Sequence, residues 1–153
     1  MIDGVIIQNL KQIADERGKV MHMLRCDSPL FEKFGEIYFS VVNPGAIKAW
    51  KRHRSMTQNF AVPIGTIKLV IYDSRDRTTS CGSIEVVEVG EEDYCLVKIP
   101  PLVWYGFQCT SSKQALVANC SDIPHAPNEA EQMDHLDSSI PYQWHIENKL
   151  RIF

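Results

Sequence analysis

The regular alternation of short strand-like segments with turn residues constrains the fold of this chain more than any other feature. Clusters of Gly, Pro, Asp, Asn and Ser separate apolar or β-branched segments at intervals of roughly 8–12 residues. The predicted strands are Gly4–Leu10, Lys19–Arg25, Gly35–Val42, Ala46–Trp50, Asn59–Pro63, Thr66–Tyr72, Ile84–Val89, Tyr94–Ile99, Tyr105–Cys109 and Ala115–Asn119. Such a rhythm is typical of an all-β sandwich or barrel with mostly antiparallel strands.

Helical patterns are short and few. Ser28–Phe34 and Asn128–Met133 have brief helical character, and the second segment follows a proline. No longer stretch repeats its apolar residues with the period of a helix. We therefore expect an all-β protein with only short helical segments.

The length of the chain fits one domain. A chain of 153 residues corresponds to about one domain at roughly 150 residues each. The tail from residue 123 onward differs in character, because a proline-rich stretch and acidic residues precede Tyr142 and Trp144. We expect a single domain over residues 1–153, with residues 123–153 as an extended C-terminal strap packed on the body by these two aromatic residues.

Charge and cysteine content exclude several classes of protein. The chain has 16 Lys and Arg against 19 Asp and Glu, for a net charge of −3. It therefore lacks the basic footprint of a general nucleic-acid-binding protein. The first residues lack the charged start and long apolar stretch that are typical of a signal peptide, and the longest apolar runs are far shorter than the roughly 20 residues of a membrane helix, so we expect neither feature. The five cysteines include no CxxC pair, which favours free thiols in the reducing cytoplasm.

The segment from Gly45 to Gly65 contains the most informative motif. It holds Lys51, Arg52 and His53, followed by Gln58. Residues two apart on a strand point the same way, so positions 51 and 53 face one side, where a residue of the next strand can oppose them. This pattern resembles the first motif of the cupin superfamily, which has a glycine, HxH, a glutamate and a second glycine at that spacing.

A second stretch strengthens the resemblance. Ile99–Phe107 resembles the second cupin motif, with Tyr105 where that motif usually has a histidine. The resemblance implies a cupin-type jelly-roll barrel that holds its ligand in the interior. Three of the four usual metal-ligand positions are then Lys51, Gln58 and Tyr105, and only His53 remains. Because a protonated lysine repels a divalent cation and a neutral amide binds it poorly, we predict no catalytic metal and no other cofactor.

Among metal-free cupins, the chain resembles the dTDP-4-dehydrorhamnose 3,5-epimerase family up to about residue 125. The matching segments are Asp15–Gly18, Phe34–Ser40 and Ile47–Lys51. Lys48–Gln58 and Ile99–Trp104 are similar to segments of the dTDP-4-keto-6-deoxyglucose 3,4-ketoisomerases. The resemblance implies a nucleotide-diphosphate sugar as substrate, dTDP-linked in this family. It also implies a homodimer formed by sheet extension, to which the apolar strand Val5–Ile7 can contribute.

Several catalytic positions of the epimerases are altered in this chain. Their catalytic histidine falls on Lys51, and their catalytic tyrosine falls near Ala118. The acidic partner of that histidine comes from a C-terminal region that this shorter chain does not clearly have. A changed reaction, changed residues for the same reaction and lost catalysis all remain open from the sequence.

The chemistry of the family is proton abstraction next to a 4-keto group, through an enolate. This requires a base, a cation or donor at the developing oxyanion, and an acid that returns a proton. His53 is the predicted base, because imidazole titrates in the right range. Lys51 is predicted to stabilise the enolate, and it serves as a base only if burial lowers its pKa. Tyr105 or Tyr38 is the predicted acid.

The remaining candidates are substrate-binding residues. By resemblance, Arg17 and Lys48 bind the diphosphate. Glu36 and Gln58 are predicted to hydrogen-bond sugar hydroxyls, Trp104 to stack on a base or sugar, and Asn119 to take a further binding role. Ordinary structural explanations compete with these roles: Trp104 suits the core, His53 suits a satisfied interior position, and the basic residues around Lys51 suit a solvated rim.

These observations favour a metal-independent nucleotide-sugar epimerase. A nucleotide-sugar 3,4-ketoisomerase, which uses the same enolate, is the alternative enzyme. A non-catalytic cupin that binds a sugar or nucleotide is the alternative from another class.

Overall fold

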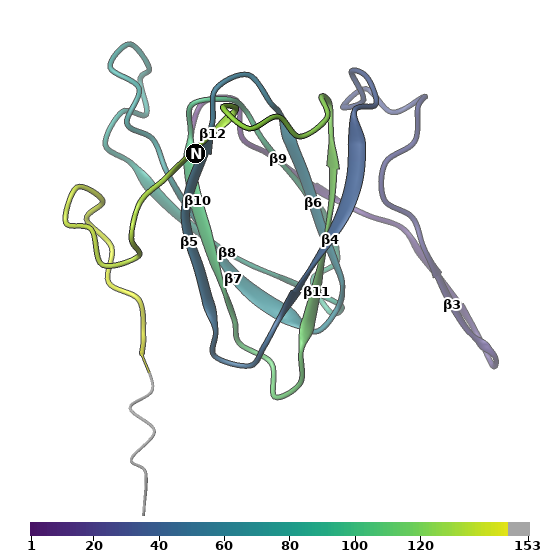
Figure 1. Cartoon of the computed structure of the whole chain (residues 1–153). Coiled ribbons are helices and arrows are strands. Elements are labelled where there is room, and N and C mark those ends of the chain that lie inside the picture. The colour runs from purple at the N-terminus through teal and green to yellow at the C-terminus, as the bar shows by residue number, and fades with distance from the viewer. Residues whose placement is uncertain (147–153) are drawn as a thin grey trace, which may run out of the picture.

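Two five-stranded antiparallel sheets face each other and form the body of the protein (Figure 1). The computed structural model describes residues 1–146. Its strands are β1 (Ile6–Asn9), β2 (Gln12–Asp15), β3 (Gly18–Met21), β4 (Glu36–Val42), β5 (Ile47–His53), β6 (Gln58–Ile64), β7 (Thr66–Tyr72), β8 (Ile84–Gly90), β9 (Cys95–Ile99), β10 (Trp104–Cys109), β11 (Ala115–Ser121) and β12 (Ala130–Gln132). The first sheet has the order β1-β9-β6-β11-β4 and the second the order β12-β5-β10-β7-β8.

The alternation of side chains along β7 explains how the layers pack. Ile67, Leu69 and Ile71 point between the two sheets into the main core, whereas Val70 points to the opposite face of the second sheet. There it joins a second apolar cluster with Trp50 and other aromatic residues. A strand buried on both faces needs a nearly continuous apolar sequence, and β7 has one.

The prediction of an all-β protein is confirmed for the described residues, but the two short helices are wrong. Ser28–Phe34 forms turns and irregular chain, and Asn128–Met133 contains strand β12. β12 pairs with β5, with Ala130 opposite His53. An isolated helix of six or seven residues is unstable in water, so pairing with a distant strand decides the conformation of this segment.

The chain after β11 crosses the second sheet on its outer face. Ile140 and Trp144 pack there in the second apolar cluster. The ring centroid of Trp144 lies 5.1 Å from that of Trp50, and Tyr142 meets Trp50 edge-on at 6.1 Å. Residues 147–153 of the predicted strap lie outside the described residues.

The hairpin of β2 and β3 projects away from the two sheets (Figure 1). Every residue of β2 is exposed, and so are all but one of β3. No helix in the described part of the chain has the length and apolar character needed to cross a membrane.

Candidate active site

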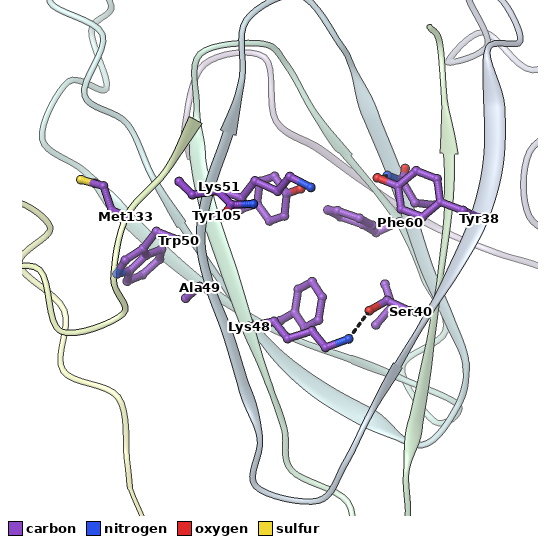
Figure 2. A pocket seen from close by; sticks show the side chains of 13 residues that line it. Tyr38, Ser40, Lys48, Ala49, Trp50, Lys51, Phe60, Tyr105 and Met133 are labelled. Carbon is purple, nitrogen blue, oxygen red and sulfur yellow. Dashed lines mark hydrogen bonds between the residues drawn. The ribbon is translucent and has the colours of Figure 1, made fainter. Parts of the chain in front are cut away.

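A cavity of about 310 Å³ opens between the two sheets (Figure 2). One wall comes from β4, β6 and β11 and the other from β5, β10 and β12. The lining residues are Tyr38, Ser40, Lys48, Ala49, Trp50, Lys51, Phe60, Tyr105, Phe107, Val117, Asn119, Gln132 and Met133. Its polar groups are thus two ammonium groups, two phenols, amides and a hydroxyl, and no carboxylate lines it among the described residues. This composition suits an anionic ligand or a reaction that develops negative charge.

A β-bulge brings both lysines into the cavity. β10 pairs with β5 in a register that shifts by one residue, because Tyr105 lies opposite Lys51 but Phe107 lies opposite Lys48. On a regular strand, residues three apart point to opposite faces. The extra residue re-aims one of them, as bulges beside functional sites commonly do.

The ammonium group of Lys51 has no hydrogen-bond or ion-pair partner among the described residues. Figure 2 shows its side chain extending from β5 toward Tyr38 on the opposite wall. Burial lowers the pKa of Lys51 from its ordinary value, because the charged form loses hydration without gaining a counter-ion. A larger share of this amine is therefore neutral than for a surface lysine at the same pH.

Lys48 is held differently. Its ammonium group donates to Ser40 Oγ at 2.7 Å and to the carbonyl of Val41 at 3.0 Å, and it thereby bridges from β5 to β4 (Figure 2). Both acceptors are neutral, so the positive charge of Lys48 is not cancelled.

Tyr38 stands on the first sheet with its hydroxyl oriented by Asn119. Asn119 Oδ1 accepts the backbone N–H of Asn59, which fixes the direction of the amide. Asn119 Nδ2 then donates to the hydroxyl oxygen of Tyr38 at 2.7 Å and also to Gln58 Oε1. Tyr38 accepts from Asn119, and its own O–H donates to Gln58 Oε1 over a long 3.5 Å, so the phenol keeps a proton that it can donate. Burial raises the pKa of Tyr38, while the hydrogen bond from Asn119 lowers it by less.

His53 lies behind the cavity wall. Its side chain is buried, and its Nε2 is 3.3 Å from the hydroxyl of Tyr105, which does line the cavity. Burial and the neighbouring charge of Lys51 lower the pKa of His53 to about 4, so the imidazole is neutral at pH 7. Burial also raises the pKa of Tyr105 well above its ordinary value.

Comparison with known proteins shows to which family this chain belongs. Residues 1–152 match the dTDP-4-dehydrorhamnose 3,5-epimerase family. The chain belongs to this family. The predictions of a cupin-type jelly roll and of an isomerase of the nucleotide-sugar epimerase type are thereby confirmed.

Individual relatives agree with the family. The spore coat polysaccharide biosynthesis protein SpsL of Bacillus subtilis (strain 168) is 28% identical over 149 residues, covering 96% of this chain and 99% of SpsL. A dTDP sugar isomerase from Desulfovibrio desulfuricans G20 is 50% identical, with a TM-score of 0.92 over 94% of this chain and 92% of that one. The fold is shared with RmlC from Legionella pneumophila, solved with dTDP-4-keto-L-rhamnose, at 20% identity and a TM-score of 0.84 over 96% and 81% of the two chains.

Most of the residues predicted for this epimerase meet at the cavity. Lys51, Tyr105, Tyr38, Lys48 and Asn119 line it. The two predicted residues that adjoin it from behind are His53 and Gln58, each hydrogen-bonded to a tyrosine of the lining.

Three predicted residues lie elsewhere. Arg17 sits exposed in the turn between β2 and β3 and pairs with Asp15. Glu36 accepts the backbone N–H of His125 at 2.9 Å and so holds the start of the C-terminal segment. Trp104 packs in the outer apolar cluster, where the guanidinium of Arg52 lies 4.6 Å from its ring centroid.

The structure also brings to the cavity residues that the sequence pattern did not indicate. Gln132 and Met133 come from β12 and from the residue that follows it, which the sequence predicted as helical. The lining also includes Ser40, Phe60 and Phe107. They lie on β4, β6 and β10, strands that also carry predicted site residues. Among the described residues, no three His, Cys, Asp or Glu side chains converge in a way that would hold a metal ion.

Proposed function

We propose that this protein epimerises a nucleotide-linked 4-keto sugar, with Lys51 as the base and Tyr38 as the acid. The observation that carries the proposal is the unpaired, partly buried amine of Lys51 facing a proton-donating phenol across the cavity. Lys51 also occupies the position on which the catalytic histidine of the family falls. A lysine at that position also offers a basic nitrogen, so it can take over the role of the base from the histidine.

The proton balance is simple. The neutral amine of Lys51 removes the proton from the carbon next to the ketone, and the electron pair of the broken C–H bond moves into an enolate. The lysine becomes an ammonium group in the same step, so its new charge stabilises the enolate oxygen. Tyr38 returns a proton to the carbon from the opposite face, and solvent restores both residues after product release. Removal and return on opposite faces invert the configuration.

His53 is less suited to be the base that contacts the sugar. Tyr105 separates its Nε2 from the cavity, and a pKa of about 4 makes its imidazole a weak base. Lys51 differs in position, since its amine reaches the cavity, and burial lowers the pKa of that amine so that more of it is in the neutral form that accepts a proton. We therefore assign the predicted role of His53 to Lys51.

The substrate class follows from the family and the charges of the site. RmlC from Legionella pneumophila was solved with a dTDP-linked keto sugar. The uncancelled charge of Lys48 offers this chain a contact for a diphosphate or for a sugar oxygen. We propose a dTDP-linked sugar and, since SpsL is a polysaccharide biosynthesis protein, a role in polysaccharide biosynthesis. All five cysteines are free thiols, which suits the cytoplasm.

We further propose a homodimer. Arg17, which resembles a phosphate-binding residue of the family, lies on the β2–β3 hairpin and is not among the residues that line the cavity of its own chain. In a dimer, the hairpin that carries it can contact the second copy. β1 also leaves one edge of the first sheet unpaired within the described chain, with Ile6 and Ile7 partly exposed, and an open edge favours pairing with another strand.

Proton NMR in D₂O tests the reaction. With a dTDP-4-keto-6-deoxy sugar, the protein is expected to exchange the C3 or C5 proton for deuterium, and the product couplings distinguish an epimerase from a 3,4-ketoisomerase. Lys51→Arg keeps the positive charge but cannot act as a base at neutral pH. We expect it to slow exchange by at least roughly 100-fold, the contribution of a positioned base.

Two further variants make this test specific. Lys51→His introduces the residue that the family usually has, and we expect it to retain exchange with an optimum at lower pH. Lys113→Arg, on the exposed surface, serves as the control and is expected to react like the unchanged protein. Full exchange by Lys51→Arg would show that Lys51 is not the base.

A further inference from the structure

The buried imidazole of His53 lies between two groups of different chemistry. Its Nε2 faces the hydroxyl of Tyr105 at 3.3 Å, and its Nδ1 lies 3.9 Å from Oε1 of Glu129. Nδ1 is buried and has no hydrogen-bond partner among the described residues. Glu129 belongs to the C-terminal segment, directly before β12, and no feature of the sequence pattern pointed to it.

Glu129 is held firmly in place. Its Oε1 accepts the backbone N–H groups of Ser55 at 2.8 Å and Met56 at 2.7 Å. Burial opposes ionisation of Glu129, but these backbone donors outweigh it and keep its pKa below the ordinary value. A fixed carboxylate therefore stands next to Nδ1 near neutral pH.

This arrangement determines which ring nitrogen carries the proton. A neutral imidazole has one N–H and one lone pair. An N–H dipole directed at a carboxylate is favourable, whereas a lone pair directed at it is repelled. With the proton on Nδ1, the lone pair of Nε2 accepts the O–H of Tyr105, and the hydroxyl oxygen of Tyr105 turns its own lone pairs to the cavity.

We propose that Glu129 is a positioning residue that keeps the proton of His53 on Nδ1, so that Tyr105 faces the cavity as a hydrogen-bond acceptor for a sugar hydroxyl. The identity of the ligand as a sugar rests on the proposed function. The polarity of Tyr105 rests only on the contacts of this chain. The cavity then has an acceptor phenol, Tyr105, on one wall and a donor phenol, Tyr38, on the other.

The other groups around His53 are consistent with a neutral ring. Lys51 on the same strand and His125 in the C-terminal segment both disfavour a positive charge on His53, and Glu129 alone favours it. Tyr105 on β10 completes the set of titratable neighbours. The balance keeps the imidazole uncharged, which the argument from its single proton requires.

Histidine ¹⁵N NMR measures this arrangement without any substrate. In the unchanged protein, the signals that disappear in His53→Gln identify His53, and we expect Nδ1 to be the protonated nitrogen. Glu129→Gln keeps an oxygen for the two backbone donors but removes the negative charge that favours a proton on Nδ1. We expect the proton to move to Nε2 in this variant.

Two variants control the NMR experiment. Glu129→Asp keeps the charge and is expected to keep the proton on Nδ1, also if Glu129→Gln fails to fold. Glu131→Gln removes a carboxylate of the same segment that pairs with Arg52 and Arg54 rather than with His53, and is expected to change nothing at the ring. A proton on Nε2 in the unchanged protein, or on Nδ1 in folded Glu129→Gln, would overturn the proposal.

Binding measurements connect the polarity of Tyr105 to the ligand. Calorimetry with dTDP-glucose and with dTDP separates the sugar from the nucleotide. Glu129→Gln and Tyr105→Phe are both expected to weaken dTDP-glucose binding by roughly tenfold, the effect of one lost hydrogen bond, and to leave dTDP binding unchanged. Equal dTDP-glucose affinity in all three proteins would overturn the role toward a sugar hydroxyl. An unchanged protein that binds neither compound would count against the proposed function, while the NMR result still decides the role of Glu129.

Discussion

At the scale of single residues, His53 links the site to stability. Its pKa is about 4 in the folded protein and 6.5 ordinarily. Between these values the unfolded chain binds more protons than the folded chain, so the free energy of unfolding falls as the pH falls from about 6.5 to about 4. The lowered pKa of His53 corresponds to a decrease of roughly 3 kcal/mol in the free energy of unfolding between these two pH values.

The prediction is that removing the imidazole reduces the sensitivity to acid. His53→Gln is expected to be less stable at pH 7, because it disturbs a buried contact, but to lose less free energy of unfolding between pH 6.5 and pH 4.5. Urea unfolding at several pH values measures both effects. His135→Gln, on a residue outside the core, is expected to follow the unchanged protein. If His53→Gln lost as much free energy of unfolding between pH 6.5 and pH 4.5 as the unchanged protein, the acid sensitivity would come from other groups.

The residues of the site also show how far the sequence pattern reaches. The period of a strand predicts one face of β5 for Lys51 and His53, and in the structure Lys51 lines the cavity while His53 contacts Tyr105 of its lining. It cannot anticipate that a bulge turns Lys48 to the same cavity, because the bulge depends on the pairing of β5 with β10. Nor does it find Glu129, whose contact with His53 joins residues 76 positions apart in the chain.

At the scale of secondary structure, strands with strong local alternation were predictable and β12 was not. β7 and β11 carry their own apolar pattern. β12 has three residues, Ala130–Gln132, and is a strand only because β5 offers an edge to pair with. Ion pairs of Glu131 with Arg52 and Arg54 hold it there, so a segment without intrinsic preference completes the cavity wall.

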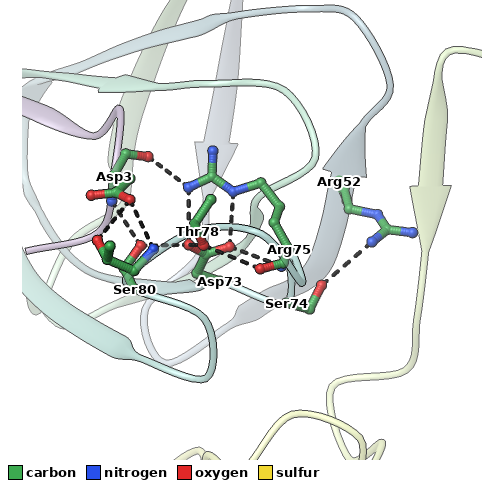
Figure 3. Close-up of polar contacts among 8 residues, drawn as sticks. Asp3, Arg52, Asp73, Ser74, Arg75, Thr78 and Ser80 are labelled. Carbon is green, nitrogen blue, oxygen red and sulfur yellow. Dashed lines mark hydrogen bonds and ion pairs between the residues drawn. The ribbon is translucent and has the colours of Figure 1, made fainter.

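A polar cluster fixes the connection between β7 and β8 (Figure 3). The buried carboxylate of Asp73 accepts from Arg75 at 2.8 and 2.9 Å, from Thr78 at 2.8 Å and from Ser80 at 2.6 Å. Arg75 also donates to the backbone carbonyl of Asp3, which ties the N-terminal segment to this loop. These donors outweigh the effect of burial and hold the pKa of Asp73 well below its ordinary value.

We predict that Asp73→Asn lowers the free energy of unfolding by about 2–4 kcal/mol, because it leaves a largely buried Arg75 without its counter-ion. Asp76→Asn, on an exposed position of the same connection, is expected to change stability by less than about 0.5 kcal/mol. Denaturant unfolding of both variants measures the difference. Equal stabilities would mean that the cluster contributes little to the fold.

At the scale of the whole molecule, the cavity depends on both sheets, and the described chain leaves apolar surface uncovered on the first one. Ile37, Phe39 and Val41 are exposed at 48%, 61% and 52% along the outer face of β4. Ile13 and Val20 are exposed on the projecting hairpin. A two-stranded hairpin is at best marginally stable alone in water, so it needs a surface to pack against. In the homodimer that we propose, a second copy of the chain would supply this surface.

The proposed homodimer therefore predicts a change of mass on charge insertion at this face. The unchanged protein is expected to have twice the mass of the chain by sedimentation or light scattering, and Phe39→Asp to approach the mass of one chain, because a carboxylate would lose its hydration in the interface. Val86→Asp is the matched control, since Val86 is exposed at 51% on β8 of the other sheet, and it is expected to remain dimeric. A monomeric unchanged protein would contradict the dimer. A dimeric Phe39→Asp would move the interface to another surface, such as the open edge of β1.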